Sequence, residues 1–95
     1  MARISLISID LSKVTNSQGL QLLLMERLDF PGWYGCNWDA FWDAITALVE
    51  MPETLELNGW ADLVRLLPRD AELMKECLSE MEAKYPTLAS KVIYA

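Results

Sequence analysis

Three short apolar segments lie at the beginning, middle and end of the chain, and their spacing constrains the fold more than any other feature. They cover residues 4–10, 54–57 and 91–94, and stretches with helical periodicity separate them. Strands joined by helical crossovers favour parallel pairing. We therefore predict an α/β fold, with a three-stranded parallel sheet covered by helices in the order β-α-α-β-α-α-β. The chain of 95 residues suits one domain over 1–95, without linker, repeat or low-complexity tract.

The segments between these strands carry four helical patterns, each bounded by a capping residue or a proline. The predicted helices run from Asn16 or Ser17 to about Leu28, from Asn37 to about Leu48, from Trp60 to Leu67 and from Asp70 to about Tyr85. In the second helix the stripe of Trp38, Phe41, Ile45 and Leu48 should face the core. In the third helix we expect Trp60, Leu63, Val64 and Leu67 to face inward.

Charge and composition exclude several classes of function. The net charge is −6, which disfavours nucleic acid and anionic membrane surfaces as partners. It suits a basic protein partner, and it serves solubility equally well. Because the chain contains no histidine, it has no Ser-His or Cys-His nucleophile system and lacks the commonest metal ligand. We expect no catalytic residue, metal or cofactor.

The two cysteines and the N-terminal segment indicate a cytoplasmic protein. Cys36 and Cys77 are far apart in the sequence and form no CxxC motif, so a disulfide framework is not expected. Residues 1–10 lack the apolar run and cleavage site of a signal peptide. No segment reaches the roughly 18 apolar residues of a membrane span. We expect cytoplasmic residence with reduced thiols.

The segment WYGCNWDAFWDAI, residues 33–45, places two aspartates four residues apart on the second predicted helix. At this spacing Asp39 and Asp43 share one face, and such like-charge pairs cost roughly 0.2–0.5 kcal/mol. Asp39 has a structural explanation, because a carboxylate in the first turn favours the helix dipole by about 0.3–1 kcal/mol. Asp43 lies mid-helix, where aspartate is a poor helix former. It indicates either a binding role or a salt bridge to a cation elsewhere in the fold.

The aromatic residues of the same segment divide between core and surface. Trp38 belongs to the core stripe, whereas Trp42 lies at its edge and suits half-buried packing or an interface anchor. Trp33 and Tyr34 lie in the loop before the helix and are better explained by contact with a partner than by core packing. The alternative for Trp33 is a place in the core.

Glutamates recur at every fourth position of the last predicted helix. Glu72, Glu76 and Glu80 would form an acidic ridge there, either functional or simply a solvated face. Glu80 and Lys84 are also spaced for a favourable i, i+4 ion pair.

The motif Tyr34-Gly35-x-Asn37-x-Asp39-Ala40-x-Trp42-Asp43 resembles the signature of the barstar family. Members of that family are intracellular inhibitors of ribonucleases, with a three-stranded parallel sheet and helices. In them the second helix and the preceding loop plug the nuclease active site, and their carboxylates take the place of the RNA phosphate. The resemblance implies partner contacts at Asp39, Asp43, Trp42, Trp33, Tyr34, Gly35, Asn37, Thr46 and Glu80, with Ala47 further along the same face.

Four positions depart from the family pattern and bear on partner choice. Cys36 replaces an acidic residue, Trp38 a leucine and Trp33 a tyrosine, and Lys84 stands where another interface carboxylate would be expected. Specificity depends on such differences at the rim of an interface.

Three functions compete at this stage. The first is an inhibitor of a basic ribonuclease or nuclease toxin domain, acting in self-protection or immunity as a monomer when free. The second is a barstar-fold interaction module with a non-nuclease partner. The third is an enzyme that uses Asp39 and Asp43, which is disfavoured because these carboxylates are expected on a convex helix without a cleft or a histidine.

Overall fold

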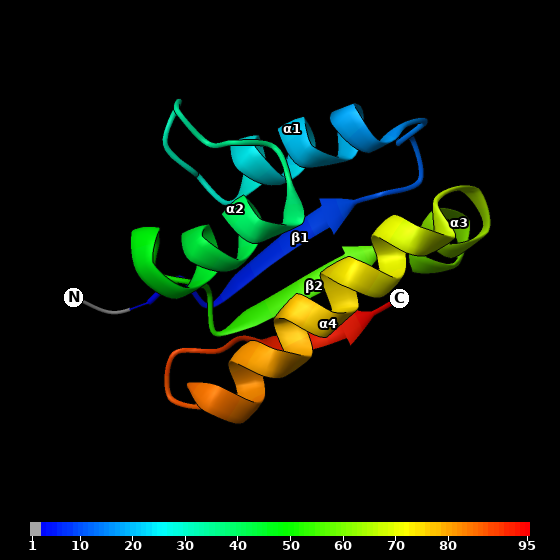
Figure 1. The fold of residues 1–95 in the computed structure, drawn as a ribbon. Coiled ribbons are helices and arrows are strands. Elements are labelled where there is room, and N and C mark those ends of the chain that lie inside the picture. The colour runs from blue at the N-terminus through cyan, green and yellow to red at the C-terminus, as the bar shows by residue number, and fades with distance from the viewer. Residues whose placement is uncertain (1–2) are drawn as a thin grey trace.

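The computed structural model describes residues 3–95 and contains three parallel strands in one sheet (Figure 1). Met1 and Ala2, which belong to the segment predicted to lack a signal peptide, lie outside the described residues. The strands are β1 (Leu6–Asp10), β2 (Thr54–Asn58) and β3 (Lys91–Tyr94), in the spatial order β1-β2-β3. Both pairs are parallel, and the predicted parallel sheet is confirmed.

The helical elements follow the predicted order. They are α1 (Ser17–Arg27), α2 (Trp38–Asp43), the π-helical turn η1 (Ala44–Leu48), α3 (Trp60–Leu66) and α4 (Pro68–Lys84). Asparagine side chains cap α1 and α2. Asn16 accepts a hydrogen bond from the Gly19 amide at 2.7 Å, and Asn37 accepts one from the Ala40 amide at 2.7 Å. Each cap satisfies an amide that the helix leaves without an internal acceptor.

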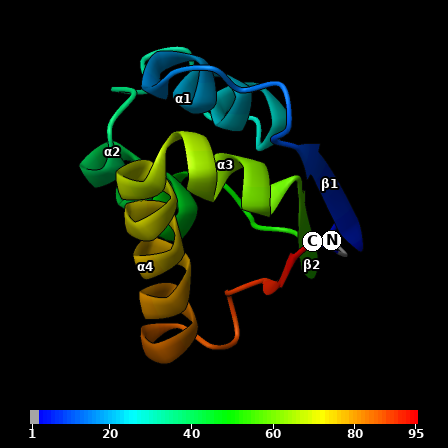
Figure 2. The same ribbon diagram turned by 90° about the vertical axis from the view of Figure 1, so that its right-hand side faces the viewer.

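The helices lie on one face of the sheet (Figure 2), so the strands are buried on one side only. Strand β2 shows the alternation, because Leu55 and Leu57 are fully buried while Thr54, Glu56 and Asn58 are half-buried. On β1, Ile9 is fully buried whereas Leu6 remains 51% exposed. The apolar run of residues 4–10 is of the kind expected for a strand buried on both faces, but the structure buries only one face of β1, and that expectation is wrong.

The fourth helix begins two residues earlier than predicted, at Pro68. Proline suits the first turn of a helix because the amide it lacks would have no partner there. In the third helix Leu63 is buried, but Val64 is 43% exposed, so Val64 was wrongly assigned to the inner face.

A wide turn follows α2 and changes which side chains face the core. The Val49 amide donates to the Ala44 carbonyl at 3.1 Å, five residues back instead of the usual four. Because each π turn holds more residues than an α turn, the inward position moves from Leu48 to Val49. Leu48 is accordingly 41% exposed and Val49 packs against the core, so the predicted place of Leu48 in the core stripe is wrong.

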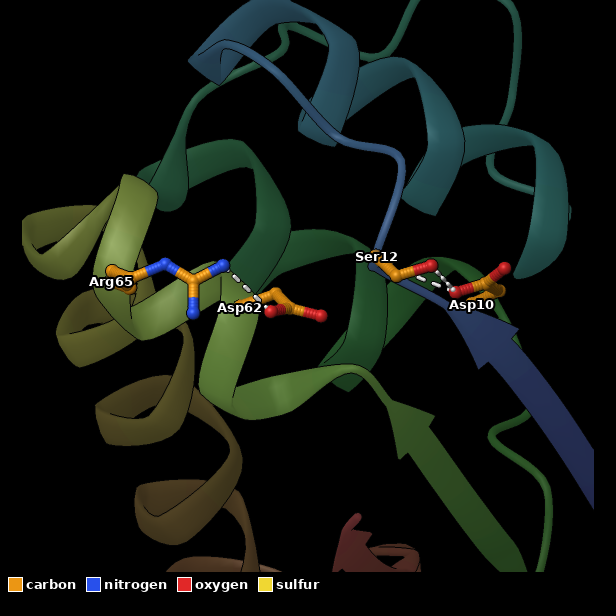
Figure 3. Close-up of polar contacts among 4 residues, drawn as sticks. All are labelled: Asp10, Ser12, Asp62 and Arg65. Atoms are coloured by element: carbon orange, nitrogen blue, oxygen red, sulfur yellow. Dashed lines mark hydrogen bonds and ion pairs between the residues drawn. The ribbon is translucent and has the colours of Figure 1, made fainter.

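Close contacts fix the edge of the sheet at which the strands end (Figure 3). Asp10 Oδ1 accepts hydrogen bonds from the Ser12 amide at 2.9 Å and the Ser12 hydroxyl at 2.6 Å. Gly59 has a φ of +78°, and a Cβ there would lie 2.8 Å from the Ser12 amide nitrogen. On α3, Arg65 pairs with Asp62 at 2.8 Å. We call this edge the carboxyl edge of the sheet. Its acidic side chains, Asp10 and Asp62, have partners within the same edge.

Candidate partner-binding groove

Helices α2 and α4 enclose an acidic groove of about 370 Å³. Two tryptophans and two aspartates of α2 line it, together with two glutamates, a leucine and a cysteine of α4. These residues are Trp38, Asp39, Trp42, Asp43, Leu73, Glu76, Cys77 and Glu80. The groove thus combines four carboxylates with two indole rings, a composition that suits a cationic side chain.

The orientation of α2 follows from its cap and its apolar side. The Asn37 cap fixes the start of the helix, and Phe41 is fully buried on the inner side. Asp39 and Asp43 are both exposed and line the groove, as expected for side chains away from the core stripe. The prediction that these aspartates lie on a convex surface is wrong, because α4 packs against α2 and the two helices form a groove.

Trp38 packs partly against the core and partly lines the groove. Its ring packs edge-on against Phe41, with 5.2 Å between centroids. Its Nε1–H donates to Asp70 Oδ1 of α4 at 2.9 Å, and Asp70 also accepts a hydrogen bond from the Ser17 hydroxyl of α1. Asp70 therefore joins three helices and holds the indole at the groove.

Trp42 lies at the other end of the groove and is half-buried, as the edge position predicted. Its ring lies 6.4 Å from that of Tyr85, which follows α4. One side of the indole therefore packs within the chain while another part lines the groove.

The four groove carboxylates differ in their charge partners. Glu80 pairs with Lys84 at 2.8 Å. Among residues 3–95, no ion pair reaches Asp39, Asp43 or Glu76. The salt bridge considered as an alternative explanation for Asp43 is therefore absent from the described part of the chain.

Cys77 on the groove floor is affected by this excess of negative charge. Partial burial first, and then the charges of the Glu80, Glu76 and Asp39 carboxylates, together raise the pKa of its thiol to about 11. The neutral thiol is therefore favoured, and a nucleophilic role for Cys77 is disfavoured.

The loop before α2 presents one of its two aromatic residues and buries the other. Trp33 is 73% exposed, which agrees with a surface position. Tyr34 is only 7% exposed, with its ring 4.8 Å from that of Phe30 and its hydroxyl donating to Gln21. The prediction that Tyr34 is a surface contact and not a core residue is wrong, because the loop turns its ring inward toward Phe30 and Gln21. Burial also raises the pKa of Tyr34 well above its usual value.

Two further predicted contact residues shape the backbone of the site. A Cβ at Gly35 would lie 3.3 Å from Asn37 Nδ2 and 3.4 Å from Ala40 Cβ, so the loop passes close to the helix start. The Thr46 hydroxyl donates to the Trp42 carbonyl at 2.6 Å, at the junction of α2 and η1. Ala47 is exposed.

Comparison with known proteins bears directly on this arrangement. The family model described as Barstar (barnase inhibitor) matches residues 4–93. The chain belongs to the barstar family. A protein of Bacillus subtilis (strain 168) named "Putative ribonuclease inhibitor YrdF" is 37% identical over 59 residues. The match covers 62% of this chain and 65% of that relative, a little less than two thirds of its length.

The structure of this barstar-family chain adds groove residues that the sequence alone did not indicate. Glu76, Leu73, Cys77 and Trp38 line the groove, but none was predicted as a contact. The spacing of Glu76 and Glu80 was the available signal. Glu72 belongs to the same series but pairs with Arg69 at 3.5 Å and lies outside the groove. The packing of α4 against α2 is what distinguishes Glu76 and Glu80, which line the groove, from Glu72, which does not.

The described residues offer neither a metal-ligand cluster nor a membrane-spanning helix. In residues 3–95 no group of three or more histidine, cysteine, aspartate or glutamate side chains could hold a metal ion. Over the same range, none of the helices combines the length and apolar character needed to cross a bilayer.

Proposed function

We propose that this chain is a protein inhibitor of a basic ribonuclease and blocks the nuclease active site with α2 and the loop before it. The proposal depends above all on one observation. Three of the four carboxylates in the groove have no cation of their own within residues 3–95. Membership of the barstar family and the name of the Bacillus subtilis relative support the same function.

The chemistry of the two surfaces is complementary. A ribonuclease active site holds a phosphate backbone and is therefore rich in cations. Asp39 and Asp43 can pair with those cations and exclude RNA, while Trp42 and the exposed Trp33 supply apolar contact area. The repulsion between the two aspartates in the free protein then becomes attraction in the complex.

In the proposed mechanism the inhibitor carries out no chemistry of its own. It acts in the cytoplasm as a monomer, either against a nuclease of the same cell or against a toxin delivered by another. The negative field of the chain, with a net charge of −6, accelerates association with a basic partner.

Barnase is a defined probe for this proposal, because the matching family model is described as a barnase inhibitor. Cleavage of a fluorescent RNA by barnase should be inhibited by the chain and restored at high salt. The Asp43→Ala variant should bind barnase more weakly by about 2–5 kcal/mol, the usual cost of removing one partner of an interfacial charge pair. The matched control is Asp62→Ala, which removes a carboxylate already paired with Arg65 on α3.

Equal inhibition by both variants would rule out the role given to Asp43. The alternative is a non-nuclease partner, which a capture experiment in the native cell can detect. Tagged wild-type chain and the Asp43→Ala variant would be compared, and each captured protein assayed for RNA cleavage. A partner that is lost with Asp43→Ala but cleaves no RNA would favour the interaction module.

A further inference from the structure

Lys84 lies at the end of the acidic groove, where its ammonium contacts two groove residues at once. Its Nζ is 2.8 Å from Glu80 Oε1 and 5.7 Å from the centroid of the Trp42 ring. The hydrogen bond that Lys84 donates to Glu80, together with the charge of Glu80, raises the pKa of Lys84 and favours its protonated form. A carboxylate beside an indole face is a typical site for a cation.

The groove carboxylates therefore fall into two sets. At Glu80, beside Trp42, a cation of the chain itself is already in place. Along Asp39, Asp43 and Glu76, no internal cation lies within ion-pair distance among residues 3–95. An incoming cation meets carboxylates without an ion pair at Asp39, Asp43 and Glu76 but must compete with Lys84 at Glu80.

We propose that Lys84 is a specificity-determining residue that fills the cation site formed by Glu80 and Trp42. The inference rests on the proposed function, since it concerns which basic partners the groove accepts. A partner that presents a cation opposite the C-terminal end of α4 is disfavoured, because it must displace Lys84 or approach its charge. A fitting partner presents its cations to Asp39, Asp43 and Glu76, and an uncharged or acidic side chain to Lys84.

Lys75 provides a matched control on the same helix. Its Nζ lies 5.0 Å from the centroid of the Tyr94 ring, so it also contacts an aromatic face, but it does not line the groove. Lys84→Gln and Lys75→Gln each lower the net charge by one from −6. A difference between the two variants therefore reports the position of the charge and not its amount.

The first experiment uses N-acetyl-arginine amide as a probe with a single guanidinium. It is titrated into the wild type and both variants at constant ionic strength, and the indole signal of Trp42 is followed by NMR. In Lys84→Gln the probe should bind at Trp42 about two- to fivefold more tightly than in the wild type, in line with the strength of exposed ion pairs. Lys75→Gln should match the wild type. An unchanged dissociation constant at Trp42 in Lys84→Gln, or an equal gain in Lys75→Gln, would overturn the inference.

The second experiment measures binding of barnase to the same proteins. The affinities of barnase for Lys84→Gln and Lys75→Gln should differ. Lys84→Gln should bind more tightly if barnase presents a cation opposite Lys84 and more weakly if it presents a carboxylate there, and equal affinities would count against the specificity role. If barnase binds none of the proteins, the proposed inhibition of barnase fails. The arginine titration still decides the inference about Lys84, because it uses no nuclease.

Discussion

Acidic side chains occur in two regions of this molecule, and the regions differ in what surrounds those side chains. At the carboxyl edge of the sheet, Asp10 accepts two hydrogen bonds from Ser12, and Asp62 pairs with Arg65 (Figure 3). In the acidic groove, only Glu80 has an ion pair among the described residues. The comparison teaches that the number of acidic residues does not locate a binding surface. What sets the groove apart is that three carboxylates without an ion pair in residues 3–95 line one depression together.

The largest effect expected at the carboxyl edge comes from its backbone. Gly59→Ala forces a side chain onto a residue with a φ of +78° and places the new Cβ 2.8 Å from the Ser12 amide nitrogen. Strain and overlap together should lower the free energy of unfolding by roughly 2–4 kcal/mol. Urea denaturation measures this loss.

Gly32→Ala is the matched control, because a Cβ at Gly32 would meet no atom within 4 Å. It should leave the unfolding midpoint nearly unchanged. An equal loss in both variants would mean that the carboxyl edge is no more constrained than the loop before α2.

A smaller loss should follow Asp10→Ala, which removes the acceptor for the Ser12 amide and hydroxyl. The hydrogen bonds from Ser12 lower the pKa of Asp10 below its usual value. A carboxyl group with a lowered pKa stabilises the fold above its unfolded pKa, near 4, and loses that contribution as pH falls through the folded pKa. Wild type and Asp10→Ala should therefore differ in stability at neutral pH and converge in acid. A constant difference across the acid range would show that the charge of Asp10 contributes nothing.

The groove should have its own pH dependence through Cys77. The pKa of this thiol is raised from 9.0 to about 11, so the native state keeps a proton that the unfolded state releases. Stability is fully present below pH 9 and falls as pH rises toward 11. Because the thiol is only partly buried, its share is about 1 kcal/mol at most after solvent screening.

Comparing the pH dependence of stability in the wild type and in Cys77→Ala isolates the contribution of this thiol. Tyr34 and Tyr94 also have raised pKa values, so both proteins should lose stability at high pH. The loss should be smaller in Cys77→Ala. Parallel profiles of the two proteins would contradict the raised pKa of this thiol.

Local signals predicted much of the fold. The element order, the parallel sheet and the cap at Asn37 follow from periodicity, capping residues and turn signals within short windows. For the first helix these signals left Asn16 and Ser17 open as caps, and the structure has Asn16. The acidic face of α2 was equally clear, because Asp39 and Asp43 share it at i, i+4 spacing.

What the sequence did not show depends on contacts between distant segments or on a change of helical period. The wide turn η1 moves Leu48 out of the core, and a fixed 3.6-residue period has no means of showing this. Tyr34 is buried because the loop folds back toward Phe30 and Gln21. The groove forms only where α4 brings Glu76 against α2.

The smallest predicted effect tests the central contrast most directly. Asp43→Asn removes the repulsion with Asp39, so it should raise the free energy of unfolding by roughly 0.2–0.5 kcal/mol. The same substitution should weaken barnase binding, since the lost charge belongs to the proposed contact surface. At the carboxyl edge the matched change is Asp62→Asn, which breaks the pair with Arg65 and should lower stability slightly without affecting binding. Calorimetric unfolding measures the stability of each variant, and titration with barnase measures the affinity of each. A stability loss in Asp43→Asn would mean that this charge serves the fold, and the distinction between the two regions would then fail.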